Sequence, residues 1–194
     1  MKYDRNVRRQ VLALSREIEE VDGVRLSKSI GFLMRLLEEA SDPRDRDDIL
    51  LALAIEYGRC GLKDKEIAIL RKRVAESPVP MMATLELADR LSSEAEHQTE
   101  SKQLVERVLA DALKADEFVR MVLGAKARIA RRINDRDMFS DALQALLNDH
   151  AYNRRSHDVM FESDLILDLP ADFCSKELVE KYRLLETESE PGAE

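Results

Sequence analysis

The stretch LLALAIEYGRCGLKDKEIAILRKRVAESP, residues 50–78, decides the fold of this chain. Its large apolar residues recur three or four positions apart, which is the spacing of one buried helix face. Gly61 interrupts this pattern and Ser77-Pro78 ends it, as glycine and proline commonly do at helix ends. The stretch therefore predicts two amphipathic helices joined by a short turn.

This pattern of two helices joined by a turn recurs along the chain with a period of 37 residues. The three Ser-Lys dipeptides begin at Ser27, Ser101 and Ser175, and both separations are 74 residues, which is twice that period. Cutting the chain at this period gives the windows 6–42, 43–79, 80–116, 117–153 and 154–190, and we expect the fifth repeat to extend over residues 154–186. Each window has a turn signal near its middle, at Gly23, Gly61, Glu94 to Gln98, Asn134-Asp135 and Pro170. A Ser or Asp near the start of each second helix predicts an N-terminal cap, and these residues are Ser27, Asp64, Ser101, Asp141 and Ser175.

In the first window, we expect one helix to continue until Asp22-Gly23, with a buried face formed by Val7, Val11, Leu14, Ile18 and Val21. In the fifth, Leu165-Ile166-Leu167 is open to two interpretations, a short strand or part of a helix over residues 163–169. Asp168 and Pro170 favour the helix, because both suit a helix end.

Helices of about 12–16 residues are marginal alone, so each pair must bury its apolar face against the next pair. We therefore predict an all-α fold, an α-solenoid of about five helical hairpins. The prediction is a single helical-repeat domain over residues 1–186, followed by a frayed acidic tail over residues 187–194.

Residues 43–79 resemble a tetratricopeptide repeat. They carry large, small and turn residues at approximately the spacing of that family, at Leu50, Leu53, Ala54, Tyr57, Gly61, Leu70 and Pro78. They depart from it at Glu66 and Arg73, where a small residue and an alanine are usual. The other windows share only the architecture. The resemblance implies a right-handed superhelix whose first helices line a concave groove for a peptide or protein segment.

The composition excludes several classes of protein. Charged residues make up 36 % of the chain and aromatic residues 5 %, with 6 Gly and 5 Pro, which excludes collagen, low-complexity disorder and a disulfide scaffold. No apolar run reaches the roughly 20 residues of a membrane span, and the charged N-terminal 20 residues do not form a secretory signal. The two distant cysteines, Cys60 and Cys174, fit a reducing compartment, so we expect a cytoplasmic protein.

The net charge of −8 belongs to the C-terminal end of the chain. Residues 156–194 hold 3 basic and 11 acidic residues, whereas residues 1–155 hold 28 of each sign. The balanced charge over most of the chain gives no general attraction to nucleic acid.

The sequence shows no catalytic or metal-binding motif. His97, His150 and His157 lack the i,i+4 spacing of a helical metal site, and neither cysteine has a histidine close to it in sequence. Glycine-rich loops for phosphates or dinucleotides are absent as well. We therefore expect a non-enzymatic protein without a metal or cofactor. An enzyme whose site is assembled from distant residues is one alternative.

Four arginines form the candidate partner-binding site. On a helical wheel with Arg120 at zero, Arg131, Arg128 and Arg132 lie at about 20°, 80° and 120°. The apolar residues of the same helix occupy the opposite side; these are Val119, Val122, Ile129 and Ile133. Arginine forks bind carboxylates well, so an acidic protein or peptide is the expected partner. An ordinary solvated face is the simpler interpretation, and an RNA-binding repeat is disfavoured because the basic area is small and has no interleaved aromatic residues.

The sequence thus predicts a protein-binding module that acts as an adaptor, a chaperone or a dedicated antagonist of one partner.

A further basic group lies at the start of the first predicted helix, since residues 2–9 carry four basic side chains. The helix dipole disfavours positive charge at a helix start. This end is therefore predicted to be either frayed or held by a partner.

Overall fold

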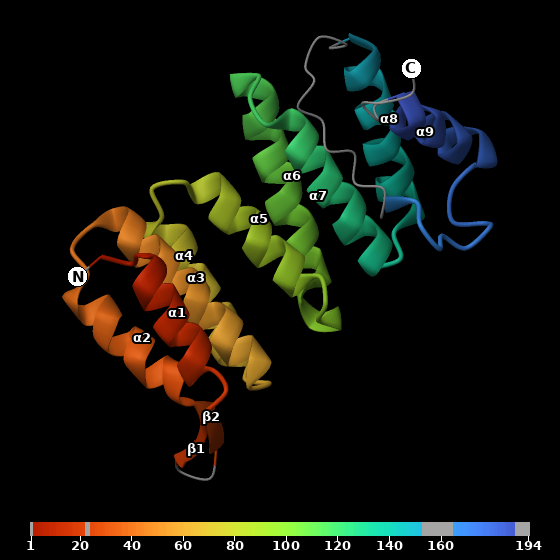
Figure 1. Cartoon of the computed structure of the whole chain (residues 1–194). Helices are drawn as coiled ribbons and strands as arrows, with labels where there is room; N and C mark the ends of the chain where they lie inside the picture. Colours follow the sequence, from red (N-terminus) through yellow and green to blue (C-terminus); the bar gives the residue numbers. More distant parts are fainter. Residues whose placement is uncertain (1, 22–23, 153–164, 189–194) are drawn as a thin grey trace. The chain divides into compact units, whose positions relative to one another are not determined.

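The computed structural model of the 194-residue chain describes residues 2–21, 24–152 and 165–188, and these form helices with one small sheet (Figure 1). The all-α prediction is confirmed at this level. The nine α-helices within the described ranges are α1 (Arg5–Leu14), α2 (Lys28–Glu39), α3 (Pro43–Arg59), α4 (Lys63–Glu76), α5 (Pro80–Leu91), α6 (Gln98–Ala115), α7 (Val119–Arg132), α8 (Arg136–Tyr152) and α9 (Lys176–Glu188). A 3-10 turn, η1 (Ala95–His97), precedes α6.

The chain divides into two compact units, Met1–Leu87 and Ala88–Glu194. Unit 1 contains α1 to α4 and the beginning of α5, and unit 2 contains the end of α5 and α6 to α9. Each unit has its own buried apolar residues, such as Leu33 and Leu50 in unit 1 and Val122 and Leu143 in unit 2. That the chain acts as a single helical-repeat domain over residues 1–186 stays a prediction.

The α3–α4 pair forms where residues 50–78 predict two helices. Asp42 begins α3, because its carboxylate accepts hydrogen bonds from the backbone N–H groups of Arg44 (2.9 Å) and Asp45 (3.1 Å), and Pro43 suits the first turn. Gly61 then adopts a φ of 74° in the turn between the helices, a conformation that glycine takes at little cost.

The two departures from the tetratricopeptide pattern are each accommodated by a neighbouring residue. The carboxylate of Glu66 lies over Gly58, where a Cβ atom would approach it to 2.8 Å. Arg73 is only 5 % exposed, and its guanidinium donates to both carboxylate oxygens of Asp47 on α3 at 3.0 Å. Arg73 also pairs with Glu86 on α5. Glu66 therefore fits because Gly58 has no side chain, and Arg73 fits because Asp47 and Glu86 supply opposite charge.

The first window contains a β-hairpin in place of the end of the expected helix. Helix α1 ends at Leu14, and Ile18–Val21 (β1) pairs antiparallel with Val24–Ser27 (β2). The hairpin extends beyond the ends of α1 and α2 (Figure 1). The prediction of helix through Ile18 and Val21 is therefore wrong, and the predicted break at Gly23 lies outside the described residues. The physical reason is that an Asp-Gly pair between β-branched residues favours a two-residue hairpin turn.

The predicted N-terminal caps are correct at two of five positions. Ser27 accepts a hydrogen bond from the N–H of Ser29 and Ser175 from that of Leu178, both at 3.2 Å. Asp64, Ser101 and Asp141 lie inside their helices, which begin earlier than expected. Ser101 is fully buried, and its hydroxyl donates to the backbone carbonyl of Ala88 at 2.6 Å, so it connects α6 to the end of α5 and does not cap a helix.

In unit 2, the turn between α7 and α8 is held by Asp135. Asn134 takes a φ of 58° there, and the Asp135 carboxylate accepts from the N–H of Met138 at 3.0 Å. Lys102 on α6 lies 2.5 Å from the same carboxylate. The hydrogen bond from Lys102, together with the one from Met138, lowers the pKa of Asp135 below its usual value. One side chain thereby connects three successive helices.

The fifth window is the least like a helix pair. Residues 165–168 form turns, so neither the helix nor the strand is present at Leu165-Ile166-Leu167. Asp168 has a φ of 55°, which no regular helix or strand accommodates. The ring of Phe173 packs edge-on against Phe139 of α8, with centroids 5.2 Å apart. Residues 153–164 and most of the predicted tail, residues 189–194, lie outside the described residues, whereas Thr187 and Glu188 belong to α9.

Candidate protein-binding surface

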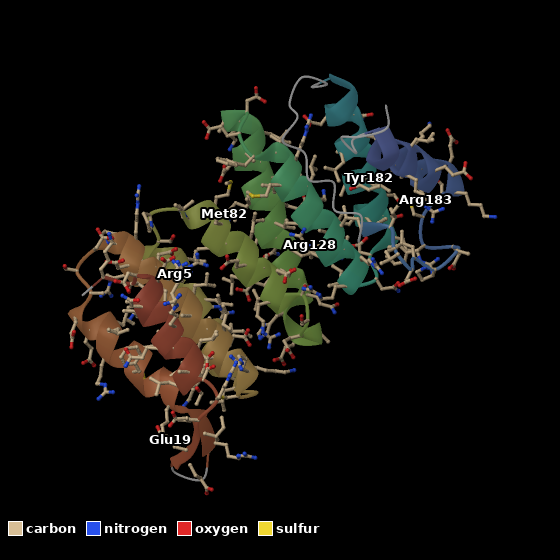
Figure 2. The ribbon with its side chains drawn as sticks, in the orientation of Figure 1. Arg5, Glu19, Met82, Arg128, Tyr182 and Arg183 are labelled. Carbon is tan, nitrogen blue, oxygen red and sulfur yellow. The ribbon has the colours of Figure 1, made fainter. Side chains whose placement is uncertain are left out.

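Three of the four predicted arginines of α7, Arg120, Arg131 and Arg132, contact three different segments of unit 2. Arg120 pairs with the carboxylate of Asp149 on α8, and Arg131 donates to the backbone carbonyl of Leu165 at 3.4 Å. Arg132 lies 2.9 Å from the carboxylate of Asp89 and donates to Ser92 Oγ at 2.7 Å. Arg128 lies on the exposed side of α7 (Figure 2).

Through these contacts, Arg120, Arg131 and Arg132 link α7 to other segments of unit 2. Their partners lie 29 to 43 residues away in sequence, so the helical wheel contains no information about them. Binding of a partner by the four arginines stays a prediction, and substituting Arg120, Arg131 or Arg132 also changes contacts within the unit.

Charge reversal tests the contact that Arg132 makes within unit 2. Arg132→Glu places a carboxylate against the Asp89 carboxylate and carbonyl, and because both side chains are partly exposed we expect a loss of about 1 kcal/mol in the free energy of unfolding. Arg107→Glu changes an exposed arginine of α6 in the same unit that makes no side-chain ion pair with the described residues, and it is expected to change the stability by no more than about 0.5 kcal/mol. Urea denaturation followed by circular dichroism measures both. Equal losses for the two variants would contradict this assignment.

A second basic surface lies on α1 and α3 in unit 1. We call it the α1–α3 face and define it by six exposed residues: Arg5, Arg9 and Leu12 on α1, Arg16 just after it, and Arg44 and Ile55 on α3. Arg5 is marked in Figure 2. The sequence indicated part of this surface through its basic residues 2–9, but it did not associate them with α3.

Two polar contacts place α1 alongside α3. The backbone N–H of Tyr3 donates to Asp45 at 3.0 Å, and Arg8 pairs with Asp48 at 2.8 Å. From the first contact to the second, the residue numbers increase on both segments, from Tyr3 to Arg8 and from Asp45 to Asp48. The two helices therefore run parallel. With a rise of about 1.5 Å per residue, Leu12 lies about 6 Å beyond Arg8 and Ile55 about 10 Å beyond Asp48. The two aliphatic residues thus differ by about 4 Å in their level along the helix pair, which is less than one helical turn.

Helix α1 presents its charged side outward because its other side is part of the core. With Arg5 at zero on the wheel, Arg9 and Leu12 lie at about 40° and 340°, and Val7 and Val11 at about 200° and 240°. Val11 is buried in one apolar cluster with residues of α2 and α3, and Val7 packs against that cluster. Asp4 caps this helix through the N–H groups of residues 6 and 7. The predicted basic end is therefore a formed and capped helix, which argues against fraying.

The arginines of the α1–α3 face are without charged partners among the described residues. Arg5, Arg9, Arg16 and Arg44 make no side-chain hydrogen bond or ion pair in the part of the chain that the structure describes. Leu12 is 60 % exposed and Ile55 52 % exposed. Unpaired guanidinium groups beside exposed aliphatic side chains are typical of a surface that contacts another molecule.

The histidines and cysteines of the described residues do not form a metal-binding cluster. Across residues 2–21, 24–152 and 165–188, no three His, Cys, Asp or Glu side chains come close enough to hold a metal ion. His97 lies beside Glu96 and Glu100 at 3.5 and 3.9 Å, and His157 is outside the described residues. Cys60 and Cys174 are partly exposed free thiols, and the Sγ of Cys174 accepts from Ser140 at 3.6 Å.

A cavity of about 440 Å³ lies between α9 and the segment before it. Ile166, Leu169 and Val179 supply aliphatic surface. Its four charged lining residues are Asp168, Lys176, Glu180 and Arg183. Two positive and two negative side chains leave no net charge, so the cavity favours neither an anion nor a cation.

In the described part of the chain, no helix combines the length and apolar character that crossing a membrane requires. Comparison with known proteins gives no match to a protein-family model, to a curated protein or to a solved structure.

Proposed function

We propose that this chain is a non-enzymatic helical-repeat module that binds another protein through the α1–α3 face. The observation that carries the proposal is the exposure of Leu12 and Ile55 beside four arginines that have no charged partner among the residues that the structure describes. A folded monomer gains nothing from leaving two large aliphatic side chains in water, whereas a partner that covers them gains their burial.

The packing order of the helices supports the repeat architecture in this proposal. In unit 1, α2 packs on α3 and α3 on α4; in unit 2, α6 packs on α7 and α7 on α8. Helices that contact their neighbours in sequence are expected of a stack of helical hairpins. The right-handed superhelix of about five pairs is proposed on this basis and on the resemblance of residues 43–79 to a tetratricopeptide repeat. The same proposal places the protein in the cytoplasm, because Cys60 and Cys174 are free thiols.

Site-specific photocrosslinking at native expression tests the proposed surface. A benzophenone amino acid at Ile55 is expected to give a covalent adduct with one partner protein, because this position lies within the face. The matched control carries the same group at Glu38, an exposed residue of α2 in the same unit. Leu12→Ser in the Ile55 crosslinking chain is expected to remove the adduct, since it takes away the neighbouring aliphatic contact.

Four results would contradict the proposed surface or its proposed partner. The same adduct at both positions, or an Ile55 adduct that persists after Leu12→Ser, would mean that the α1–α3 face does not select the partner. An adduct with the mass of two copies of this chain would assign the face to self-association. No adduct at either position would also reject the proposed function.

A further inference from the structure

Resting on the proposed function, we infer that the partner segment recognised by the α1–α3 face is acidic and amphipathic, with carboxylates for the arginines and aliphatic or aromatic side chains for Leu12 and Ile55. The juxtaposition of these two kinds of residue on neighbouring parallel helices carries this inference. It names the chemistry of the partner, which the proposed function leaves open.

The four arginines of the face carry positive charge and have no ion-pair partner in the described ranges. Arg5, Arg9, Arg16 and Arg44 are all exposed. Three carboxylates on or next to α1 and α3 have other contacts: Asp48 pairs with Arg8, Asp45 accepts from the N–H of Tyr3, and Asp4 caps α1. Charge complementarity selects partners and raises their association rate, and arginine binds carboxylates in a forked geometry. An acidic segment therefore satisfies groups that the fold itself leaves exposed.

The apolar residues determine the second property of the partner. Leu12 lies between Arg5 and Arg9 on one side of α1 and α3 on the other, as the wheel and the Arg8–Asp48 pair require. Ile55 lies on α3, less than one helical turn further along. Arg5 and Arg9 lie about 6 Å apart along α1, and Arg16 follows the end of this helix. A segment that places apolar residues at its centre and carboxylates around them matches this arrangement.

Nucleic acid fits this face less well than an acidic protein segment. Stacking on exposed aromatic rings contributes much of the binding to single strands, but Leu12 and Ile55 are aliphatic. The nearby ring of Tyr3 lies under the guanidinium of Arg8, with 5.3 Å between the guanidinium carbon and the ring centroid. A membrane surface fits less well too, because Val7 and Val11, which form the apolar side of α1, pack in the protein core.

Fluorescence anisotropy on the full-length chain provides the test. The probe is a labelled synthetic peptide of about 15 residues, with Glu and Leu arranged so that a helix would carry them on opposite sides. We expect saturable binding that weakens about tenfold for Arg5→Glu/Arg9→Glu and about tenfold for Leu12→Ser/Ile55→Ser. Raising the salt concentration should weaken binding to wild type more than binding to Arg5→Glu/Arg9→Glu, since salt screens exposed charges.

The matched control reverses two charges elsewhere on unit 1. Arg25 and Arg35 are exposed and lie on β2 and α2, outside the face, so Arg25→Glu/Arg35→Glu is expected to change the affinity by less than about twofold. The test variant keeps its fold for a physical reason: Arg5 is the first residue of α1, where a negative charge interacts favourably with the helix dipole. Circular dichroism checks this before any binding is measured.

Three further probes complete the experiment: a peptide of the same composition with its order scrambled, a single-stranded RNA and vesicles of anionic phospholipid. Equal binding of the scrambled peptide, no effect of Arg5→Glu/Arg9→Glu, or tighter binding of RNA or vesicles through the same arginines would overturn the inference. Photocrosslinking at Ile55 distinguishes this failure from that of the proposed function. A Leu12-dependent adduct without acidic-peptide binding rejects the chemistry alone, and the absence of both rejects the surface.

Discussion

Arg73→Met is expected to lower the free energy of unfolding by about 3–5 kcal/mol, because it leaves two carboxylates without the buried cation that neutralises them. Arg73 lies on α4, Asp47 on α3 and Glu86 on α5. The side chains of Arg73 and Asp47 are only 6 % and 14 % exposed, so water compensates little for the lost pair. Urea denaturation, followed by circular dichroism, measures the loss.

Two comparisons identify the origin of this loss. Neutralising both acids in the same chain, as Arg73→Met/Asp47→Asn/Glu86→Gln, is expected to restore part of the stability because the repulsion between carboxylates is gone. Lys72→Met changes a neighbouring, more exposed cation whose partner Glu76 is 3.9 Å away, and should change stability by less than about 1 kcal/mol. No recovery in the triple variant would show that packing, and not charge, is what Arg73 contributes.

Phe139→Ala is the second large expected effect, with a loss of about 3–5 kcal/mol from unit 2. Phe139 is fully buried on α8, and its ring meets that of Phe173 at an interplanar angle of 78°. Removing one ring leaves a cavity and takes away an edge-to-face contact worth about 0.5–1.5 kcal/mol. Because Phe173 lies three residues before the start of α9, we also expect the amides of α9 to exchange hydrogen faster.

Phe118 offers the same substitution at an exposed position of the same unit. It is 61 % exposed and begins α7 with a φ of 58°, so Phe118→Ala is expected to change stability by no more than about 0.5 kcal/mol. Urea denaturation gives the difference between the variants, and hydrogen exchange gives the effect on α9. Unchanged protection of α9 in Phe139→Ala would mean that the Phe139–Phe173 contact does not hold this helix.

Local spacing in the sequence was enough to place several helices. The period of Leu50, Leu53 and Tyr57, the turn at Gly61 and the stop at Ser77-Pro78 predicted α3 and α4 with their buried sides. The same reasoning failed after Leu14, because Ile18 and Val21 have a spacing that suits a helix face and side chains that also suit a strand. Asp22-Gly23 was the signal that could have identified the hairpin.

The candidate surface shows a different limit. Residues 2–9 were recognised as basic and partner-held or frayed, but Ile55 entered the α1–α3 face only through the contacts of Tyr3 and Arg8 with α3. Likewise, Arg132 was expected at the surface of α7, and it contacts Asp89 and Ser92, 40 or more residues earlier in the chain. A helical wheel shows how the residues of one helix are arranged around its axis. It does not predict which other segment packs beside that helix.

By itself, the sequence determined the helical class, the positions of the helix pairs in windows two to four and the absence of a recognisable catalytic motif. These properties depend on residues a few positions apart. Only the tertiary structure decided which arginines form ion pairs within the protein, as Arg73 and Arg120 do, and which form none with the described residues, as is the case for Arg5 and Arg9. The physical reason is that the Coulomb energy depends on distance in space, and folding brings together charges that lie 26 or 29 residues apart in the chain.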